Sequence, residues 1–272
     1  MRITIYQPRY FPQLHYFNRI LSSDVFVILD GAQYTKSLVH HEDSGKSRRH
    51  TSYQSDTPIK LSQGMYLLTI PVRHDGLLPL RATTIDYMHK WVPKHLATIK
   101  TAYGRSPYFS PLFSSLRALL TQKEEILGTF TTKTIIWGLS HVLELNLSAQ
   151  ELTLEHLNAK LQKTKSRLKN VISDSDTGVS RPEGLQKGTE WTVAICRMLG
   201  ATEYYHGGTA RAGYMELDQY KKFGITPLVQ EWKCQSYTQQ FQTIPFIPNL
   251  SIIDLIMNVS PKKAREILGV NG

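Results

Sequence analysis

Cysteine is nearly absent from this chain of 272 residues, which contains only Cys196 and Cys234. Two cysteines without zinc-type spacing exclude a disulfide framework and a cysteine-based metal site. Cys196 lies in the apolar segment 191–199, which predicts a helix, so we expect a small buried hydrophobe there. Cys234 follows Lys233, whose charge predicts a lowered thiol pKa, although a nucleophilic role is the less favoured interpretation.

Long apolar runs are also missing. No stretch approaches the roughly 20 apolar residues that span a bilayer, and the first residues do not form a signal-peptide pattern. We therefore expect a cytoplasmic protein with no membrane span. Hydrophobic residues make up 41% and charged residues 20%, which is typical of a globular chain able to bury a large core.

The common signatures of cofactor and metal enzymes are absent. The ten histidines do not form a His-Glu-x-x-His or similar ligand spacing. Neither a Gly-x-Ser-x-Gly elbow, nor a Gly-x-Gly-x-x-Gly turn after a strand, nor the kinase motif set occurs. We therefore predict no cofactor and no metal, and chemistry that relies on side chains and positioning.

Acidic residues are few: 22 against 32 basic ones, which gives a net charge of +10. This balance predicts an anionic partner, and phosphate-bearing small molecules, anionic lipid headgroups and nucleic acid all qualify. Five cations fall within the ten residues 160–169 without an acid. A solvated surface is the favoured interpretation of that segment, and phosphate capture from a substrate or from RNA is the alternative.

The most informative stretch is the opening of the chain. An apolar run from Met1 to Tyr6, a helix-like segment 14–22 and a second apolar run 24–30 predict two buried parallel strands joined by a helix. Ligands in such folds bind at the carboxyl ends of the strands, so we expect Gln7, Tyr10 and Asp30 to share one rim. The predicted fold class is α/β, with a parallel or mixed sheet, flanking helices and a Rossmann-like arrangement.

The same stretch carries a resemblance. Its motifs are Gln-Pro-x-Tyr-Phe-Pro at 7–12, Tyr16-Phe17, the run 24–30, and Gln33-Tyr34-x-Lys36. They resemble the opening of the WbqC-like proteins, which are encoded in bacterial O-antigen gene clusters. The resemblance implies a role in surface-polysaccharide assembly. It also implies site roles for Arg49, for the turn Tyr205-His206-Gly207-Gly208, and for Tyr214. In a doubly wound sheet, these residues would converge with the rim residues, among which we count Tyr34 and Lys36 as further ligand-binding candidates.

Other residues are candidates on chemical grounds. Lys187 and the start of the next helix, with Thr189 as expected N-cap, combine a cation with exposed amides, which favours anion binding. His206 and His95 are candidate general bases. For His95, a packed histidine is the favoured alternative. Asp30 is a candidate to orient the base or to accept a proton from an amine.

Two segments carry alternative interpretations. Residues 112–147 have helical periodicity, but Leu143–Leu147 also fits a strand edge. Asp254, in the first turn of a helix that Ser251 caps, either complements the helix dipole, which we favour, or reaches into the site.

We predict one domain built from an N-terminal α/β half (1–110), a helical insertion (111–180) and a C-terminal α/β half (181–272). The leading hypothesis is a transferase that moves an acyl or aminoacyl group onto a nucleotide-linked amino sugar, so the expected partner is a phosphorylated or nucleotide-linked small molecule. The second is a nucleic-acid-binding protein or a tRNA-dependent transferase, with tRNA or DNA as partner. The third is a noncatalytic scaffold.

Overall fold

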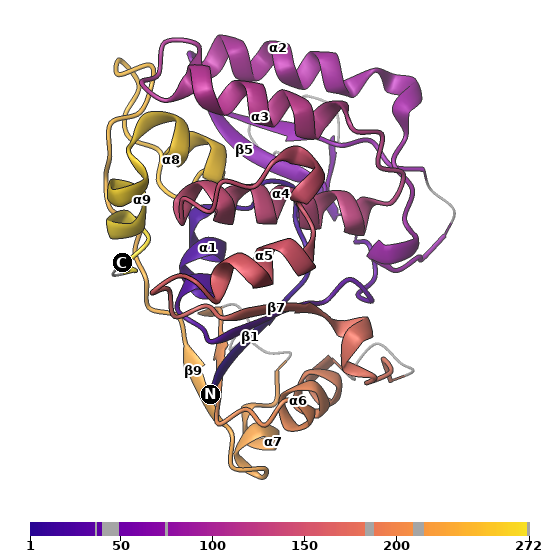
Figure 1. Cartoon of the computed structure of the whole chain (residues 1–272). Coiled ribbons are helices and arrows are strands. Elements are labelled where there is room, and N and C mark those ends of the chain that lie inside the picture. Colours follow the sequence, from indigo (N-terminus) through magenta and orange to yellow (C-terminus); the bar gives the residue numbers. More distant parts are fainter. Residues whose placement is uncertain (36, 40–48, 74–75, 183–187, 209–214, 271–272) are drawn as a thin grey trace.

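A parallel sheet organises the molecule (Figure 1). The computed structural model describes residues 1–35, 37–39, 49–73, 76–182, 188–208 and 215–270, and of residues 37–39 and 49–51 it describes the backbone alone. Five strands form the sheet in the order β7-β2-β1-β8-β9, and every adjacent pair is parallel. Their bounds are β1 Arg2–Tyr6, β2 Val25–Ile28, β7 Asn170–Ser173, β8 Glu203–His206 and β9 Thr226–Val229. The predicted α/β, Rossmann-like fold class is confirmed.

The chain builds the sheet outward from β1 in two directions. Helix α1 (Leu14–Leu21) joins β1 to β2, and β7 extends the sheet beyond β2. The chain then returns to the other side of β1, where α6 (Gly188–Met198) leads to β8 and α7 (Leu217–Lys221) leads to β9. The strand order therefore reverses between β1 and β8, the point at which doubly wound sheets bind ligands.

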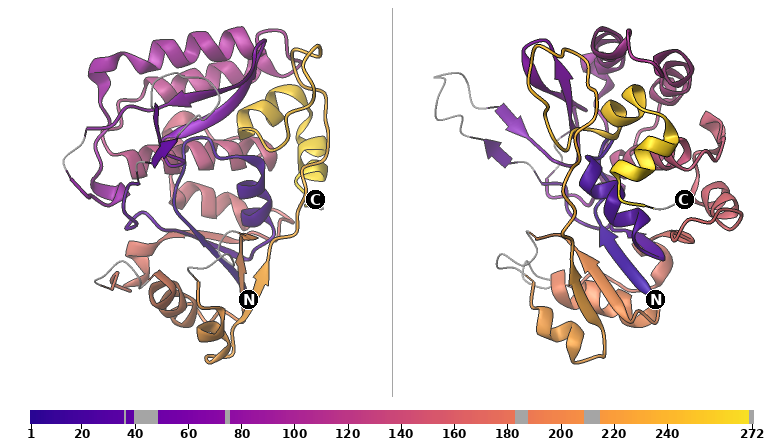
Figure 2. Two further views of the ribbon diagram at one scale, coloured as in Figure 1. Left: turned by 180° about the vertical axis from the view of Figure 1, so that it is seen from behind. Right: turned by 90° about the vertical axis from the view of Figure 1, so that its left-hand side faces the viewer.

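Both faces of the sheet are buried, which explains why its strands read as almost continuous apolar runs. Along β2, Val25 and Val27 pack with Trp191 of α6 on one face. Phe26 and Ile28 alternate with them and join the larger core on the opposite face. Figures 1 and 2 show α6 and α7 below the sheet and the remaining helices above it.

The long connection between β2 and β7 supplies most of the upper layer. It contains two antiparallel strand pairs, β3 (Ser37–Val39) with β4 (Arg49–Thr51) and β5 (Asp56–Leu61) with β6 (Gly64–Thr69). The helices α2 (Trp91–Tyr103), α3 (Phe109–Thr121), α4 (Leu127–Val142) and α5 (Leu154–Leu161) follow. Helices α8 (Ile252–Asn258) and α9 (Pro261–Ile267) pack against the same core (Figure 1). Short 3₁₀ turns lie at Leu80–Ala82, Tyr87–His89, Ala149–Glu151 and Asp174–Thr177.

The structure agrees with some local predictions from the sequence and contradicts others. Segment 111–180 contains helices, and it also contributes β7 to the central sheet. The strand-edge alternative at 143–147 is wrong, because α4 ends at Val142 and Glu144 and Asn146 have positive φ angles of 54° and 52°. Thr189 is not an N-cap, because α6 already begins at Gly188. Among the described residues, no helix combines the length and apolar composition needed to cross a membrane.

Candidate functional site

A cavity of about 480 Å³ opens at the carboxyl ends of β1, β2 and β8. Gln7 follows β1, Leu29 follows β2, and His206 ends β8, so three strands deliver residues to one space. Its position is the strand-order reversal between β1 and β8. The lining residues are Ile5, Tyr6, Gln7, Arg9, Arg19, Leu29, Tyr53, Gly188, Thr192, Tyr204, His206, Gly207 and Met215.

The cavity has two chemically different walls. Tyr6 packs toward the α1 side of the sheet, and Arg9, Arg19 and Tyr53 complete a basic and aromatic wall. Apolar side chains of the α6-side core form the opposite wall together with two polar groups: Ile5, Leu29, Tyr204, Met215, Thr192 and His206. Such a space suits a ligand in which a polar ring, such as a sugar or a base, carries phosphates.

The amide of Gln7 is held in one orientation. The backbone N–H of Thr35 donates to Gln54 Oε1 at 2.7 Å, and Gln54 Nε2 donates to the Gln33 carbonyl at 3.0 Å. Gln54 Nε2 also donates to Gln7 Oε1, which accepts a second bond from the Tyr53 hydroxyl, both at 2.8 Å. The Gln7 oxygen is therefore occupied, so this side chain offers its Nε2 donors to a ligand.

Arg9 reaches the cavity from the loop after β1. Its Nη2 donates to the Tyr6 hydroxyl at 2.6 Å, and its guanidinium carbon lies 4.6 Å from the centre of the Tyr6 ring and 4.5 Å from that of Tyr53. Its Nε is buried without a hydrogen-bond partner among the described residues. The aromatic rings of Tyr6 and Tyr53 therefore hold this cation, a role that a carboxylate often has.

Arg19, in the last turn of α1, is 5% exposed. Its Nε and Nη2 donate to Gln230 Oε1 at 3.1 and 2.8 Å. Gln230 is oriented in turn, because its Nε2 donates to the His15 carbonyl at 2.8 Å. The guanidinium lies against Gly207, where a Cβ atom would come within 3.0 Å of Arg19 Cζ and 3.2 Å of Nη1. A side chain at position 207 would displace Arg19.

His206 supplies an imidazole at the end of β8. It is 3% exposed, and its ring stacks on that of Tyr204 with centroids 5.8 Å apart. Its Nδ1 lies 3.0 Å from the Gly207 carbonyl oxygen, which only accepts hydrogen bonds, so Nδ1 carries the proton of the neutral ring. The lone pair then resides on Nε2, the atom a general base would use.

Asp30 lies beside the cavity without lining it. Burial, followed by its hydrogen bond to Asp174 and the negative charge there, raises the pKa of Asp30 to about 7. Asp174 is held by the backbone N–H of Gly31 at 3.0 Å, and Arg81 Nη1 lies 4.0 Å from Asp30 Oδ1 and 3.8 Å from Asp174 Oδ2. The two carboxyls thus form a pair that can hold a proton near neutral pH.

Other predicted site residues lie apart from the cavity. Tyr10 is 0% exposed, and its hydroxyl lies 3.0 Å from His95 Nδ1 within the core. Burial lowers the pKa of His95 to about 4. Tyr34 is half-buried, with its hydroxyl 3.1 Å from Ser55 Oγ. Tyr205 is also off the cavity, with Arg2 over its ring.

The other predicted site residues either lie off the cavity or lie outside the described part of the chain. Gly208 follows the cavity residue Gly207 but is exposed and does not line the space. Lys36, Lys187 and Tyr214 lie outside the described residues, as does the side chain of Arg49. The predicted site therefore comes together at Gln7, His206 and Gly207, and all the proposed roles stay predictions.

Burial decides the expectations for the two cysteines and for Asp254. Cys196 is buried, as predicted, and burial raises the pKa of its thiol to about 12. The expected lowering at Cys234 is wrong: burial raises its pKa, and its sulfur accepts a bond from the Asn249 N–H at 3.2 Å. Asp254 is 0% exposed and accepts bonds from the hydroxyls of Tyr103 and Tyr237, so it does not reach the cavity.

Sequence reasoning missed both cavity arginines. Arg9 stands inside the quoted motif Gln7–Pro12, so its position beside Gln7 was an available signal. The sequence carries no such signal for Arg19. The packing of α1 decides whether a residue in its last turn faces β9 or solvent. Tyr53 was equally hidden, because it belongs to a turn far from β1 in sequence.

Comparisons with known proteins agree with the motifs of the opening segment. Among curated proteins, the chain is 25% identical over 262 residues to the uncharacterized protein Rv1507c of Mycobacterium tuberculosis (strain ATCC 25618 / H37Rv), which covers 95% of this chain and 94% of that protein. No solved structure matches the chain significantly. A model of the WbqC-like protein family matches residues 7–266, and the chain therefore belongs to that family.

Proposed function

We propose that this protein is a cytoplasmic group transferase of bacterial surface-polysaccharide (O-antigen) biosynthesis that moves an acyl or aminoacyl group onto the amine of a nucleotide-linked amino sugar. The observation that carries the proposal is the cavity at the strand-order reversal, where His206 faces the same space as Gln7 and two arginines. Its volume of about 480 Å³ lies within the roughly 300–1,000 Å³ typical of small-molecule sites.

The proposed step uses a side chain as the base. The amine nitrogen of the sugar attacks the acyl carbonyl carbon of an activated ester or thioester donor, and a new C–N bond forms. His206 Nε2 accepts the proton that the nitrogen loses. The bond to the donor's oxygen or sulfur breaks, and that leaving group takes the electron pair and then the proton held by His206. The Asp30–Asp174 pair supplies a second proton store near neutral pH.

Mass spectrometry of reaction mixtures tests the proposal. The protein is incubated with a panel of nucleotide-linked amino sugars and acyl donors, including acyl thioesters and aminoacyl-tRNA. We expect a mass gain of one acyl group on one sugar, and its loss in His206→Asn. His89→Asn is the matched control, because His89 lies on the surface. Turnover in His206→Asn equal to that of the control would refute the role of this base.

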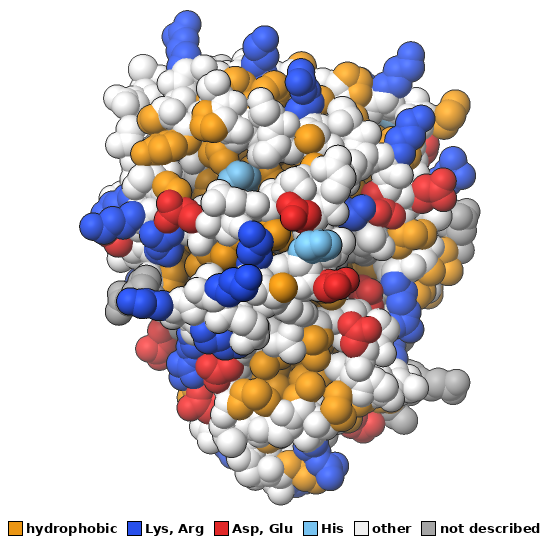
Figure 3. Space-filling model, in the orientation of Figure 1, with side chains coloured by type: hydrophobic (Ala, Val, Ile, Leu, Met, Phe, Trp, Pro, Cys, Tyr) orange, Lys and Arg blue, Asp and Glu red, His pale blue; other side chains and the backbone are white. Residues whose placement is uncertain are grey.

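Nucleic-acid binding is the second candidate, and net charge favours it. The basic segment 160–169 precedes β7 and therefore lies toward the amino ends of the strands, away from the cavity. Figure 3 shows basic side chains gathered over α9 and the turn before β7, interspersed with acidic ones. A steep salt dependence of tRNA binding, lost on replacing Lys163 and Lys165, would favour this candidate.

A further inference from the structure

Two arginines share the cavity without an acidic partner among the described residues. No ion pair between described residues involves Arg9 or Arg19. A second cavity of about 380 Å³ lies at the amino ends of the strands, and its arginines are paired with acids. There Arg2 pairs with Glu203 at 2.7 Å, Arg167 with Asp24 at 3.0 Å and Arg265 with Glu144 at 2.9 Å. Of these two cavities, only the one at the carboxyl ends holds arginines that no described acid neutralises.

The positive charge is concentrated around one ring. The guanidinium carbons of Arg9 and Arg19 lie 4.6 and 4.7 Å from the centre of the Tyr6 ring, so both cations contact one aromatic side chain. Their field acts on nearby groups. Burial first, and then the charges of Arg9 and Arg19, hold the pKa of His15 at about 4.

Burying an arginine without a counter-charge is costly, and an anion that reaches it recovers that cost. Arg19 is 5% exposed and is held by Gln230, a neutral acceptor, where a carboxylate would have neutralised it. Arg9 bonds to described residues through Nη2, and Arg19 bonds through Nε and Nη2, so the Nη1 donors of both remain for a ligand. Gly207 lacks a side chain where one would push Arg19 away.

We propose that Arg9 and Arg19 form a phosphate-binding subsite that takes the phosphate or diphosphate of an organic molecule. Arginine forks match phosphate oxygens in pairs, which a sugar hydroxyl does not require. Gly188, the first residue of α6, lines the same cavity and adds the positive end of a helix. That the molecule is a nucleotide-linked sugar rests on the proposed function, whereas the subsite itself does not.

The subsite also orients the ligand. The phosphates lie on the wall of Tyr6, Arg9 and Arg19, and the remainder of the molecule extends toward Thr192 and His206 on the opposite wall. This places the group to be modified beside the imidazole.

Calorimetric titration with inorganic phosphate, pyrophosphate and uridine diphosphate tests the subsite. We expect wild-type protein to bind pyrophosphate and uridine diphosphate, with affinity that falls as sodium chloride rises. Arg9→Ala should weaken binding about tenfold to a hundredfold, the range of a charge-assisted contact. Arg19→Lys keeps the charge but loses the fork and should weaken it about tenfold.

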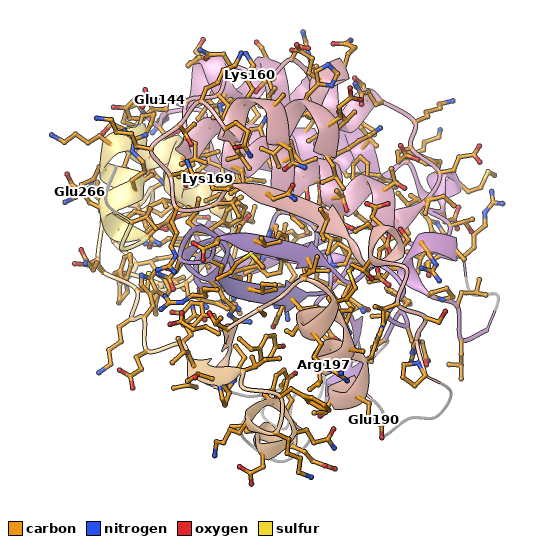
Figure 4. All side chains as sticks on the ribbon, turned by 60° about the horizontal axis from the view of Figure 1, so that its bottom comes forward. Glu144, Lys160, Lys169, Glu190, Arg197 and Glu266 are labelled. Atoms are coloured by element: carbon orange, nitrogen blue, oxygen red, sulfur yellow. The ribbon has the colours of Figure 1, made fainter. Side chains whose placement is uncertain are left out.

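Arg197→Ala is the matched control. Arg197 also stacks on an aromatic ring, Phe223 at 4.0 Å, but it is exposed near the far end of α6 (Figure 4). We expect it to bind like wild type. Equal binding by Arg9→Ala and Arg197→Ala, or no wild-type binding at millimolar concentration, would overturn the subsite. Arginine-dependent binding without any transfer to an amino sugar would refute the proposed function and leave the subsite intact.

Discussion

Replacing Gly207 by alanine should displace Arg19, whereas the same change at Gly208 should be silent. A Cβ atom at position 207 would meet the Arg19 guanidinium, with Cζ at 3.0 Å and Nη1 at 3.2 Å, closer than ordinary contacts allow. At position 208 nothing lies within 4 Å of the added atom. Neither glycine has a positive φ angle, so backbone strain does not distinguish them.

The magnitude follows from what holds Arg19. It cannot retreat without losing its bonds to Gln230 Oε1 at 3.1 and 2.8 Å. Hydrogen bonds of a charged group contribute about 1.5–3 kcal/mol, and these two share one acceptor, so we expect a loss near 2 kcal/mol. For a chain of 272 residues, whose entropy of unfolding is about 0.6 kcal/mol/K, that corresponds to a melting temperature lower by about 3–4 °C. Gly208→Ala should change stability by less than about 0.5 kcal/mol.

Differential scanning calorimetry and titration with uridine diphosphate measure both effects. Gly207→Ala should melt lower and bind the diphosphate more weakly than wild type, and Gly208→Ala should do neither. In an Arg19→Ala background the alanine at 207 should cost little, because its clash partner is gone. Equal melting and binding of the two glycine variants, or additive losses in the double variant, would refute the reasoning.

Other predictions concern protonation, the amide of Gln7 and the two thiols. Burial and Asp174 raise the pKa of Asp30 to about 7, so between pH 4 and 7 the folded protein retains a proton that the unfolded chain loses. The stability of the wild type should therefore fall relative to that of Asp30→Asn as the pH rises from 4 to 7. Melting temperatures of the two proteins that change in parallel across that range would contradict this. Gln7→Glu should keep the bond from Tyr53 yet abolish diphosphate binding, since an acceptor and a negative charge replace the Nε2 donors; unchanged affinity in titration would exclude a contact there. Cys196 should resist iodoacetamide at pH 8 until the protein unfolds, and early labelling seen by mass spectrometry would show that it is accessible.

Several features of the sheet and the site could be predicted because they are local. The apolar run 24–30 indicates a strand buried on both faces, and the structure confirms this. The ends of such parallel strands meet at one edge, which brings Gln7 and the turn at His206-Gly207 into one cavity.

Other features depend on packing that no local pattern records. Tyr10 was expected on the rim, but its N–H donates to the Gln54 carbonyl and its ring packs beside Trp91, because the chain turns inward after the strand. Arg19 enters the site only because α1 packs near Gln230 at the end of β9. Side-chain direction on a helix is set by its partners, and those partners are over 200 residues away in the chain.

Diffraction from crystals grown with a nucleotide-linked amino sugar tests the central claim most directly. We predict that its phosphates lie within hydrogen-bond distance of Arg9 and Arg19 and that the sugar amine faces His206. A nucleotide sugar bound at the amino ends of the strands, or with its phosphates turned away from both arginines, would contradict the account.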